Sequence, residues 1–401
     1  MNTGTMLPLS AKDVRRVVTS LFHALFSSSL WHSNDSRKID AAVAGLDIEE
    51  ARLLVAKSFF FFGQEHPPGL VPHPLPLPWL VGELCRTGLD SFNFQTSGST
   101  GTQKTIPCKR PLFESEIAAL AHLFANRKRV LSVVPEHHIF GFAFSVFLPK
   151  YLGIPVVRLA PLPTTAFLDS LQAGDLVLAF PRFWQALLEV AKEREAQKQY
   201  SDALMGISST APCPPEVITG LKERLLHSMV EIYGSTETSA VGYRLAPHQP
   251  YTLLSAWQKV EQAGQETLIA RRYADGTTDP PQNLQDRVDW VADRQFFPIG
   301  RHDKAVQVGG VNVYPDDVAR VIAAHPSVQE CAVRLMRPEE GVRLKAFIVP
   351  TPDVPLDACP ALFGAAFRKW LLATLGASAC PRAFSYGREL PRNSMGKLSD
   401  W

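Results

Sequence analysis

Residues 94–104 read FQTSGSTGTQK, a loop rich in glycine, serine and threonine that follows a strand-like segment. Backbone N–H groups and hydroxyls in such a loop can converge on the oxygens of a phosphate, and Lys104 adds a positive charge. An exposed turn is the alternative, because clusters of these residue types mark loops more often than binding sites. The spacing of Gly98 and Gly101 does not fit the Walker A loop, which ends in Gly-Lys followed by serine or threonine. The flanking sequence must therefore decide between a phosphate site and a turn.

The segments that follow this loop alternate between strand-like and helix-like patterns. Short apolar runs such as RVLSVVP (129–135) and DLVLAF (175–180) are separated by helical patterns such as ESEIAALAHLFANR (114–127). This alternation predicts βαβ units and a largely parallel sheet. Ligands of such sheets bind in the loops at the strand ends, which is where we expect residues 94–104 to lie. Residues 10–60 are predicted to be helical, with one apolar face that includes Val14, Val17, Leu21 and Leu25.

The composition excludes several classes of protein. A chain of 401 residues with 46% hydrophobic residues can bury a large core and divides into two or three domains. The 41 basic and 39 acidic side chains are interspersed, which argues against a nucleic-acid-binding stripe or a polybasic membrane anchor. The six cysteines form no C-x-x-C pair, so we expect no zinc site, no disulfide framework and a reducing compartment. Without a clear signal peptide or membrane-length apolar run, we expect a cytoplasmic protein.

A second loop, EIYGSTETSAVGYR (231–244), also follows a strand-like run. Its hydroxyls suit a phosphate, Glu237 suits Mg²⁺, and Tyr233 suits stacking on a base. A β-turn with incidental polar residues is the alternative reading. Two later segments add to the pattern. One (286–328) contains an Arg-x-Asp turn, a Gly-Gly loop and a helix start marked by proline and aspartates, and the other is the tail ELPRNSMGKLSDW (389–401).

In this order and spacing, the four loops resemble the adenylate-forming superfamily of acyl-CoA synthetases, aryl-acid ligases, peptide-synthetase adenylation domains and beetle luciferases. The resemblance covers roughly residues 90–401. It implies an α/β fold, with a large adenylation domain of mixed and parallel sheets and helices (1–302) and a small mobile α+β domain (303–401). It also implies ATP and Mg²⁺ as cofactors and a small carboxylic acid as the substrate. The region before the first loop is shorter than in typical members.

The resemblance implies which residues bind ATP. TSGSTGTQK corresponds to the phosphate loop, with Gln103 where proline is usual, and YGSTET matches the adenine and magnesium loop, with Glu237 as the metal ligand. Asp286 falls where the family keeps the aspartate that grips the ribose, although Leu284 and Gln285 replace the usual Thr-Gly before it. The implied ATP-binding residues are Thr96, Ser97, Gly98, Ser99, Thr100, Gly101, Thr102, Lys104, Tyr233, Gly234, Ser235, Asp286 and Arg301.

The resemblance also implies a two-step reaction. Lys397 in the closing motif would neutralise charge while the acid attacks the α-phosphorus of ATP and pyrophosphate leaves. A thiol would then displace AMP from the acyl adenylate. Between the steps the family rotates its small domain, here about Asp303, so that the Gly309-Gly310 loop lines a thiol tunnel. The implied catalytic residues are Lys397, Thr236, Glu237 and His138.

Two segments bound the acid. VPEHHIFGFAFSVFLP (134–149) matches the substrate-side motif and places His138 beside the carboxylate, with a satisfied core histidine as the alternative. Residues 137–149 contain no acidic residue to pair with an α-ammonium group, which favours an aryl or aliphatic acid without an amine. ISSTAP (207–212) resembles the opposite wall of the pocket. The implied acid-binding residues are His138, Phe142, Ser209, Thr210, Ala211, Gly234 and Ser239.

Two thiol acceptors remain open at this point. A short N-terminal region is shared with aryl-acid ligases of aryl-polyene and xanthomonadin-type pigment clusters, which load hydroxybenzoate-like acids onto an acyl carrier protein. An acidic carrier protein would suit basic clusters in the small domain, whereas free CoA is the alternative. We favour the carrier protein. A catalytically silent scaffold protein is disfavoured because the implied catalytic residues are present together. The basic residues concerned are Arg334, Arg337, Arg343, Lys345, Arg382, Arg388 and Arg392.

Overall fold

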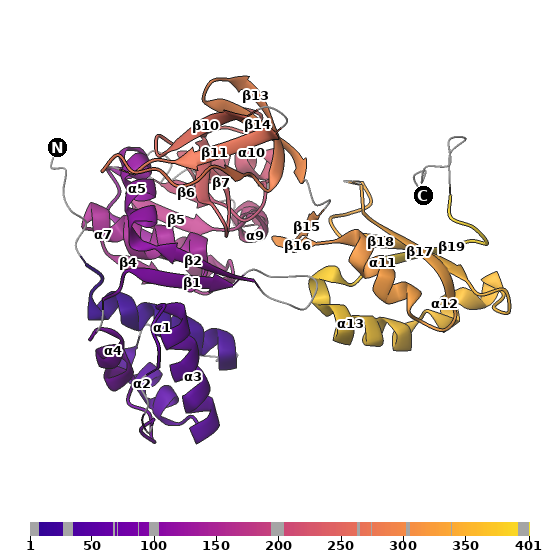
Figure 1. The fold of residues 1–401 in the computed structure, drawn as a ribbon, viewed down its shortest axis with the longest axis horizontal. Helices are drawn as coiled ribbons and strands as arrows, with labels where there is room; N and C mark the ends of the chain where they lie inside the picture. Colours follow the sequence, from indigo (N-terminus) through magenta and orange to yellow (C-terminus); the bar gives the residue numbers. More distant parts are fainter. Residues whose placement is uncertain are drawn as a thin grey trace. The chain divides into compact units, whose positions relative to one another are not determined.

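The structure is a computed structural model, and it divides into two compact units (Figure 1). The first unit comprises Met1–Gln95, Thr105–Leu284 and Val288–Pro298, and the second comprises Thr96–Lys104, Gln285–Arg287 and Ile299–Trp401. The expected domain boundary at 302/303 falls outside the described residues and stays a prediction. The described residues are 8–26, 35–66, 69, 71–86, 88–95, 104–193, 204–262, 265–273, 275–301, 305–337, 339–391 and 401.

A nine-stranded mixed sheet forms the centre of the first unit in the described part of the chain, in the order β13-β14-β9-β8-β7-β6-β5-β3-β4. The predicted parallel arrangement is confirmed for its last five strands, while β8, β9 and β14 continue the sheet in antiparallel fashion. The parallel strands are β3 (Arg129–Ser132), β4 (Val156–Arg158), β5 (Asp175–Ala179), β6 (Met205–Ser208) and β7 (Ser228–Ser235). The others are β8 (Ser239–Arg244), β9 (Tyr251–Leu253), β13 (Asp286–Ala292) and β14 (Gln295–Arg301).

Alternate residues of the parallel strands pack on opposite faces of this sheet, as the pleat requires. Val130 and Leu176 belong to one core cluster, and Leu131 and Val177 belong to another. The first face is covered by α5 (Arg110–Leu120), η2 (Ala121–Phe124), α6 (Ile139–Phe142), the π-helical turn η3 (Ala143–Phe147) and α7 (Leu148–Leu152). The second face is covered by α8 (Thr165–Ser170), α9 (Pro181–Glu193) and α10 (Pro215–Arg224). Both faces are therefore buried.

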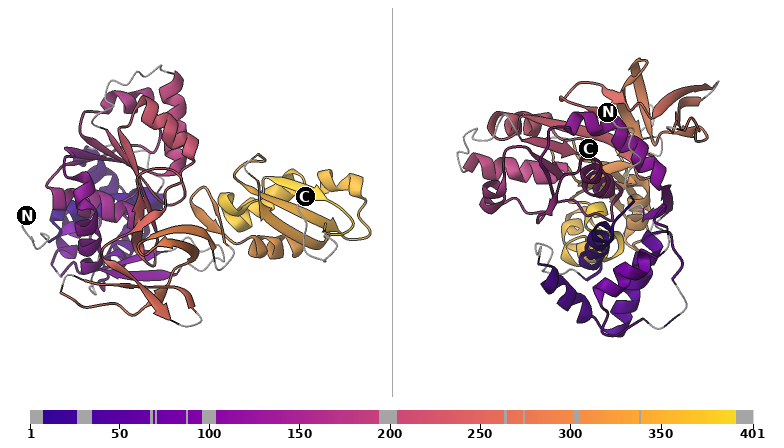
Figure 2. Two further views of the ribbon diagram at one scale, coloured as in Figure 1. Left: turned by 90° about the horizontal axis from the view of Figure 1, so that it is seen from above. Right: turned by 90° about the vertical axis from the view of Figure 1, so that its left-hand side faces the viewer.

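The predicted helical region near the N-terminus is confirmed and contains three helices. A fourth helix follows them in sequence. In Figures 1 and 2 these helices are drawn in indigo and purple. On the first helix Val14, Val17 and Phe22 are fully buried, whereas Leu21 and Leu25 pack at the margin of the core. The predicted apolar face is thus in the correct position, and it also includes Phe22. The helices are α1 (Ala11–Phe26), α2 (Ser36–Ala44), α3 (Ile48–Phe61) and α4 (Leu77–Leu84).

The strand before the predicted phosphate loop does not belong to the large sheet. β1 (Ser91–Gln95) pairs with β2 (Thr105–Lys109) in an antiparallel hairpin, with Gln95 opposite Thr105. We expected this loop at an end of a parallel strand, and that expectation was wrong. The reason is local: Phe92 and Phe94 alternate toward the core, which holds the strand on the helical face. A further antiparallel sheet contains β10 (Trp257–Gln262), β11 (Gln265–Arg271) and β12 (Gln282–Asn283).

The second unit is an α+β arrangement, drawn in orange and yellow in Figure 1. β17 and β18 are antiparallel, β18 and β19 are parallel, and the two larger helices contribute Val318 and Leu371 to their core. Among the described helices, none combines the length and apolar character that crossing a membrane requires. The elements are β15 (Val306–Val308), β16 (Val311–Val313), α11 (Pro315–Ala323), β17 (Val328–Leu335), β18 (Leu344–Pro350), η4 (Leu356–Ala358), α12 (Cys359–Leu362), α13 (Ala365–Ala379) and β19 (Ala383–Tyr386).

Candidate active site

Three loops with predicted site residues follow parallel strands of the first unit at one edge of the sheet. The strands β3, β6 and β7 are aligned through register pairs such as Ser132 with Leu178, and Ala179 with Ser208. Because parallel strands end at the same edge, the loops that follow them lie along one border of the sheet. The fold therefore brings together the His138 loop, the Ser209–Ala211 turn and the turn after β7, which are separated by about a hundred residues of sequence.

His138 stands immediately before α6 in an extended conformation, and its carbonyl accepts a hydrogen bond from Phe142 N at 2.7 Å. The residue is exposed, which does not fit the alternative of a core histidine. The surrounding protein nevertheless disfavours the charged ring and lowers its pKa. Its ring lies 4.6 Å from the ring of His137, with the planes inclined by 36°. His138 is thus a neutral imidazole at the surface, and its contact with an acid stays a prediction.

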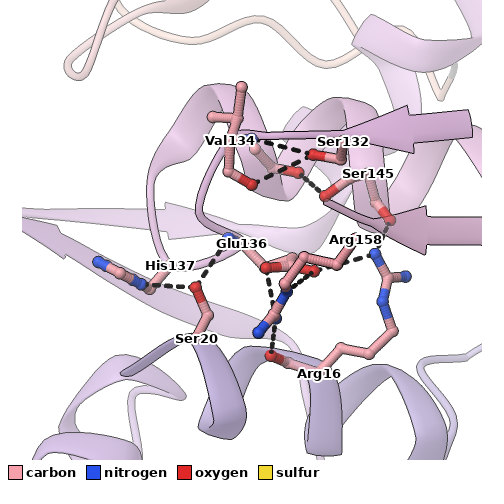
Figure 3. Close-up of polar contacts among 9 residues, drawn as sticks. Arg16, Ser20, Ser132, Val134, Glu136, His137, Ser145 and Arg158 are labelled. Carbon is pink, nitrogen blue, oxygen red and sulfur yellow. Dashed lines mark hydrogen bonds and ion pairs between the residues drawn. The ribbon is translucent and has the colours of Figure 1, made fainter. Parts of the chain in front are cut away.

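A polar cluster that sequence reasoning missed lies behind this loop (Figure 3). The fully buried carboxylate of Glu136 accepts hydrogen bonds from Arg158 Nη2 at 2.6 Å and from Arg16 Nη2 at 3.2 Å. Ser20 Oγ lies 2.8 Å from Nδ1 of His137. Burial, with the positive charge of Arg158 as a smaller cause, lowers the pKa of His137 to about 3. Both histidines are therefore neutral near pH 7.

Phe142, which we expected beside the substrate, lies in an aromatic cluster of the core. It is fully buried, with ring centroids 4.6 Å from Phe92, 5.2 Å from Phe113 and 5.3 Å from Phe147. A side chain without accessible surface borders no space that a water molecule can enter. The structure thus gives Phe142 a packing role that needs no ligand, and its predicted contact with the acid stays untested.

The turn after β6 is held by a second buried carboxylate. Glu231, which is 4% exposed, accepts hydrogen bonds from Cys213 N at 3.0 Å and from Arg244 Nε at 2.6 Å. Ser209 Oγ donates to the carbonyl of Ile232 at 2.9 Å, so its proton is already engaged. We expected that hydroxyl to bond the substrate, and in this conformation it has only an acceptor to offer.

Thr210 has a backbone conformation that is unusual for its residue type. Its φ of 76° lies in the left-handed region, where a β-branched side chain is strained, and the residue is exposed. Such strain persists only where neighbouring contacts hold the backbone, and here the hydrogen bonds of Ser209 and Cys213 flank it. Ala211 follows and is partly buried. The turn is therefore rigidly held and presents the Thr210 side chain to solvent.

Tyr233 and Gly234 end β7 in a closely packed setting. The Tyr233 ring lies 5.4 Å from Tyr251 and 5.3 Å from Phe296. A Cβ atom on Gly234 would lie 2.0 Å from the carbonyl oxygen of Ser239, so only glycine fits here. The predicted stacking of Tyr233 on adenine stays a prediction, but the aromatic neighbours already fix the orientation of this ring.

The turn that follows is a compact hydrogen-bonded unit. Ser235 N donates to Thr238 Oγ1 at 3.0 Å, and Thr238 N donates to Ser235 Oγ at 3.3 Å. The two residues between them, Thr236 and Glu237, form the tip and are partly exposed. Ser239, an expected acid-binding residue, is 5% exposed and has a φ of 54°. The turn thus presents Thr236 and Glu237 and keeps Ser239 inside.

Two buried charged side chains form hydrogen bonds with the backbone at the end of this turn. Arg271 donates to the carbonyl of Thr238 at 2.6 Å and stacks over Trp257 at 4.3 Å. Glu116 accepts a hydrogen bond from Ala240 N at 3.0 Å, and burial raises its pKa. Neither residue stood out in the sequence. Arg271 is followed by Arg272, and Glu116 follows Glu114 and Ser115, so no sequence signal distinguishes either residue from a solvent-exposed charge.

The predicted residues of the second unit are described separately. Lys104 is exposed, Asp286 is partly buried at the start of β13, and Arg301 ends β14. Gly309 and Gly310 form the two-residue turn between β15 and β16, with φ values of 62° and 83° that a type I′ hairpin requires. The predictions that lie outside the described residues are Thr96, Ser97, Gly98, Ser99, Thr100, Gly101, Thr102, Asp303 and Lys397.

The basic cluster that we expected to meet a carrier protein is paired within the second unit. Glu340 lies 2.7 Å from Arg334 Nη1, 3.0 Å from Lys345 Nζ and 3.4 Å from Arg337 Nε. The hydrogen bond from Arg334, with smaller contributions from Arg337 and Lys345, holds the pKa of Glu340 well below its usual value. Arg343 donates to the carbonyl of Ala377. Glu340 thus pairs with three of the basic residues, which weakens the argument for a carrier protein at these positions, and docking itself stays untested.

Comparison with known proteins gives this site its family context. Residues 93–267 match the model for AMP-binding enzymes, and residues 317–397 match the model for the C-terminal domain of AMP-binding enzymes. A 4-coumarate–CoA ligase from Halorhodospira halophila is 32% identical over 407 positions, which span 98% of this chain and 100% of the relative. A 4-coumarate–CoA ligase from Rhodobacter capsulatus is 36% identical over 314 positions, covering 77% of this chain and 74% of the relative.

Solved structures share the fold. The amide bond synthetase from Marinactinospora thermotolerans superimposes with a TM-score of 0.63 over 97% of this chain and 92% of that protein. An o-succinylbenzoate CoA synthetase from Bacillus subtilis gives 0.61 over 97% and 91%. Both are 16% identical to this chain, so the likeness concerns the architecture alone.

Proposed function

This chain belongs to the AMP-binding enzymes of the adenylate-forming superfamily, and on that premise we propose that it is an acid–thiol ligase that joins an aryl acid to coenzyme A. The acid would attack the α-phosphorus of ATP, forming an acyl adenylate and releasing pyrophosphate. The thiolate of CoA would then attack the acyl carbon and release AMP. The first step breaks a phosphoanhydride bond of ATP, and the second step breaks the acyl–phosphate bond of the adenylate.

One observation carries the proposal: the three predicted site loops of the first unit leave parallel strands at the same edge of the sheet. His138, Thr210 and Glu237 are thereby presented along one border. The chain is also 32% identical over 407 positions to a relative that is named a 4-coumarate–CoA ligase and is covered over its full length. Carboxylate recognition, acid positioning and phosphate binding need such groups from separate loops.

The class of acid follows from the carboxylates near this border. Recognition of an amino acid needs a free acidic side chain for the ammonium group. Glu136, the one acidic residue beside the histidines, is fully buried against Arg16 and Arg158. Glu231 is likewise engaged by Arg244. Neither of these carboxylates is available, and we assign the third, Glu237, to Mg²⁺, which supports an acid without an amine. An aromatic acid agrees with the names of two relatives reported above.

Of the two acceptors that the sequence left open, CoA has the better support. Three relatives that are 32–36% identical over 77–98% of this chain are named CoA ligases. The argument for a carrier protein used a basic cluster, and in that cluster Glu340 engages Arg334, Arg337 and Lys345. An acidic recognition helix would have to compete with this internal carboxylate. We therefore propose free CoA, with the carrier protein as the alternative outcome of the test.

Glu237 is a suitable ligand for Mg²⁺. Its partly exposed carboxylate lies in a turn with the hydroxyls of Ser235 and Thr236, and Mg²⁺ prefers such oxygen ligands together with phosphate oxygens and water. When bound, the ion would withdraw charge from the phosphate oxygens. The turn itself would orient the triphosphate, because the hydrogen bonds between Ser235 and Thr238 hold its backbone.

The test is exchange of labelled pyrophosphate into ATP, measured with panels of benzoates, cinnamates, hydroxybenzoates, fatty acids and amino acids. We expect exchange with aryl acids and none with amino acids. CoA and a phosphopantetheinylated carrier protein, supplied at equal thiol concentration, then compete for the product. Absence of acid-dependent exchange throughout would show a silent homologue, and faster transfer to the carrier protein would reverse the proposed acceptor.

The role proposed for Lys397 needs its own measurement. Lys397→Ala should reduce adenylate formation by about 100-fold or more, because the charge that develops during attack loses its counter-charge. Thioester formation from supplied acyl adenylate should be nearly unchanged. An equal loss in both half-reactions would mean that this lysine does not act in the first step alone.

A further inference from the structure

Helix α1 reaches the histidine loop through two side chains on one face. Arg16 and Ser20 are four residues apart, so they project side by side from the helix. Arg16 Nη2 donates to Glu136 Oε1 at 3.2 Å and to the carbonyl of Ser145 at 2.7 Å. Ser20 Oγ accepts a hydrogen bond from Glu136 N at 3.0 Å. In Figure 3 both side chains point from α1 into the loop that carries His137.

Arg158, at the end of β4, closes this cluster from the other side. It contacts Glu136 Oε2 at 2.6 Å and Oε1 at 3.2 Å, and it donates to the backbone carbonyl of Arg16 at 2.7 Å. The carboxylate is therefore held by two guanidinium groups from segments 120 and 22 residues away in sequence. Charge-assisted hydrogen bonds of this kind restrict direction as well as distance. They fix where the peptide after Glu136 can go.

Ser20 also contacts the His137 ring. The hydroxyl of Ser20 accepts from Glu136 N, and its oxygen lies 2.8 Å from Nδ1 of His137, where it donates or accepts according to the tautomer of the ring. A neutral ring that accepts at Nδ1 carries its proton on Nε2. The lowered pKa of His137 is consistent with this neutral state. The ring of His138 lies next to it, at 4.6 Å.

We propose that α1 positions the His137–His138 segment for the acid, with Arg16, Ser20 and Glu136 as positioning residues that touch no substrate. The inference rests on the proposed function, in which His138 meets the carboxylate. At metal sites, removing a group that orients a ligating residue typically costs about 10- to 100-fold in affinity or activity, and we expect an effect of similar kind here. A shift of the loop by about 1 Å would have an effect of that size.

A purely stabilising role explains the cluster less well. Buried ion pairs are seldom more stabilising than apolar side chains of similar volume, because desolvating the charges offsets their attraction. Val134 and Phe144, which are close to Glu136 and Ser145 in sequence, are buried apolar residues. Orientation of the loop is the property that hydrogen bonds supply and apolar packing does not.

Two buried serines allow a matched test. Ser20→Ala removes the hydroxyl that contacts the loop. Ser58→Ala removes an equally buried hydroxyl on α3, which donates only to Leu54 within its own helix at 2.7 Å. We expect Ser20→Ala to raise KM for the acid about tenfold and to leave KM for ATP unchanged, whereas Ser58→Ala changes neither. Amide hydrogen exchange of residues 133–138 should also accelerate about tenfold in Ser20→Ala alone.

The two readouts separate the inference from the function on which it rests. If the parent protein activates no acid, the proposed function fails, and the exchange measurement still decides whether α1 holds the loop. Equal exchange of residues 133–138 in parent and Ser20→Ala would overturn the positioning role. Faster exchange with an unchanged KM for the acid would also overturn it, because the segment would then be held without any consequence for binding.

Discussion

Two buried carboxylates lie at opposite ends of the parallel sheet and hold different parts of the molecule. At the amino end, Asp175 starts β5 and accepts from Arg129 at 2.6 and 2.9 Å. These two residues are also register partners on adjacent strands. At the carboxyl end, Glu136 joins α1, the loop after β3 and the end of β4. One pair connects two adjacent strands of the sheet, and the other connects distant segments to the loop that carries His138.

Comparing the two carboxylates can distinguish a contribution to stability from a contribution to the proposed site. Both carboxylates are almost fully buried, at 1% exposed for Asp175 and 0% for Glu136, so each is costly to leave with an unpaired arginine. Only the second lies beside a residue that we propose to meet the substrate. The sheet therefore offers an internal control for the proposed active site, with a buried carboxylate paired to arginine at both ends and the His138 loop at only one.

The largest effects should come from removing these carboxylates. Glu136→Ala should lower the free energy of unfolding by about 3–5 kcal/mol, because Arg16 and Arg158 lose a shared and fully buried partner. Asp175→Ala should cost about 1–3 kcal/mol, because Arg129 is 21% exposed and water screens its charge. Denaturant titration measures this loss. Only Glu136→Ala should also raise KM for the acid, measured on the fraction that remains folded. A comparable rise in Asp175→Ala would break the distinction between the two ends.

Two glycines provide a smaller perturbation of the same two regions. A Cβ on Gly141 would lie 2.0 Å from the carbonyl oxygen of Pro135, so Gly141→Ala must displace the histidine loop. We expect it to lose about 1–3 kcal/mol of stability and to weaken acid binding. Gly174, before β5, has a φ of 93°, and its nearest neighbours are atoms of the flexible Lys128 side chain.

Gly174→Ala is therefore the matched control. It should lose about 1–2 kcal/mol through backbone strain, with no change in KM for the acid. Thermal unfolding and acid-dependent pyrophosphate exchange would be measured on both variants. Normal acid binding in Gly141→Ala would show that the position of Pro135 does not matter for the site.

The smallest expected effect is on the pH dependence of stability. It arises from His137, which lies at the carboxyl end of the sheet. The pKa of His137 falls from 6.5 to about 3 on folding, so below 6.5 the unfolded chain binds a proton that the folded chain does not. Stability is therefore lost as pH falls from 6.5 toward 3. His137→Gln should remove about 1 kcal/mol per pH unit from this slope, less than the full 1.4 because the ring is partly exposed. Denaturant titrations between pH 7 and 4.5 measure the slope, and identical slopes would contradict the prediction.

The features that depend on a short continuous stretch of sequence could be predicted. The glycine- and hydroxyl-rich motifs indicated the superfamily, the periodic apolar residues indicated α1, and Pro315 marked the start of α11. Each of these depends on a short stretch of chain, because helix periodicity and capping are local properties. The alternation of strands and helices predicted the parallel part of the sheet for the same reason.

The partners of a side chain were harder to predict than its type. Arg334, Arg337 and Lys345 suggested a docking surface, and the turn between β17 and β18 brings the nearby Glu340 against all three. Phe142 was predicted beside the acid, and the fold packs it against the distant Phe92 and Phe113, so its contact with the acid stays a prediction. Charge and apolarity can be read from a sequence, whereas the neighbours that neutralise or bury them cannot.

The sequence by itself thus determined the family, the motif residues and the absence of an acidic partner for an amino acid in residues 137–149. Only the tertiary structure decided that α1 stands behind the histidine loop, through Arg16 and Ser20. The physical reason is that the free energy of a buried charge depends on the distance and orientation of its partners. Those distances are set when segments more than a hundred residues apart, such as Arg16 and Glu136, are packed together by the fold.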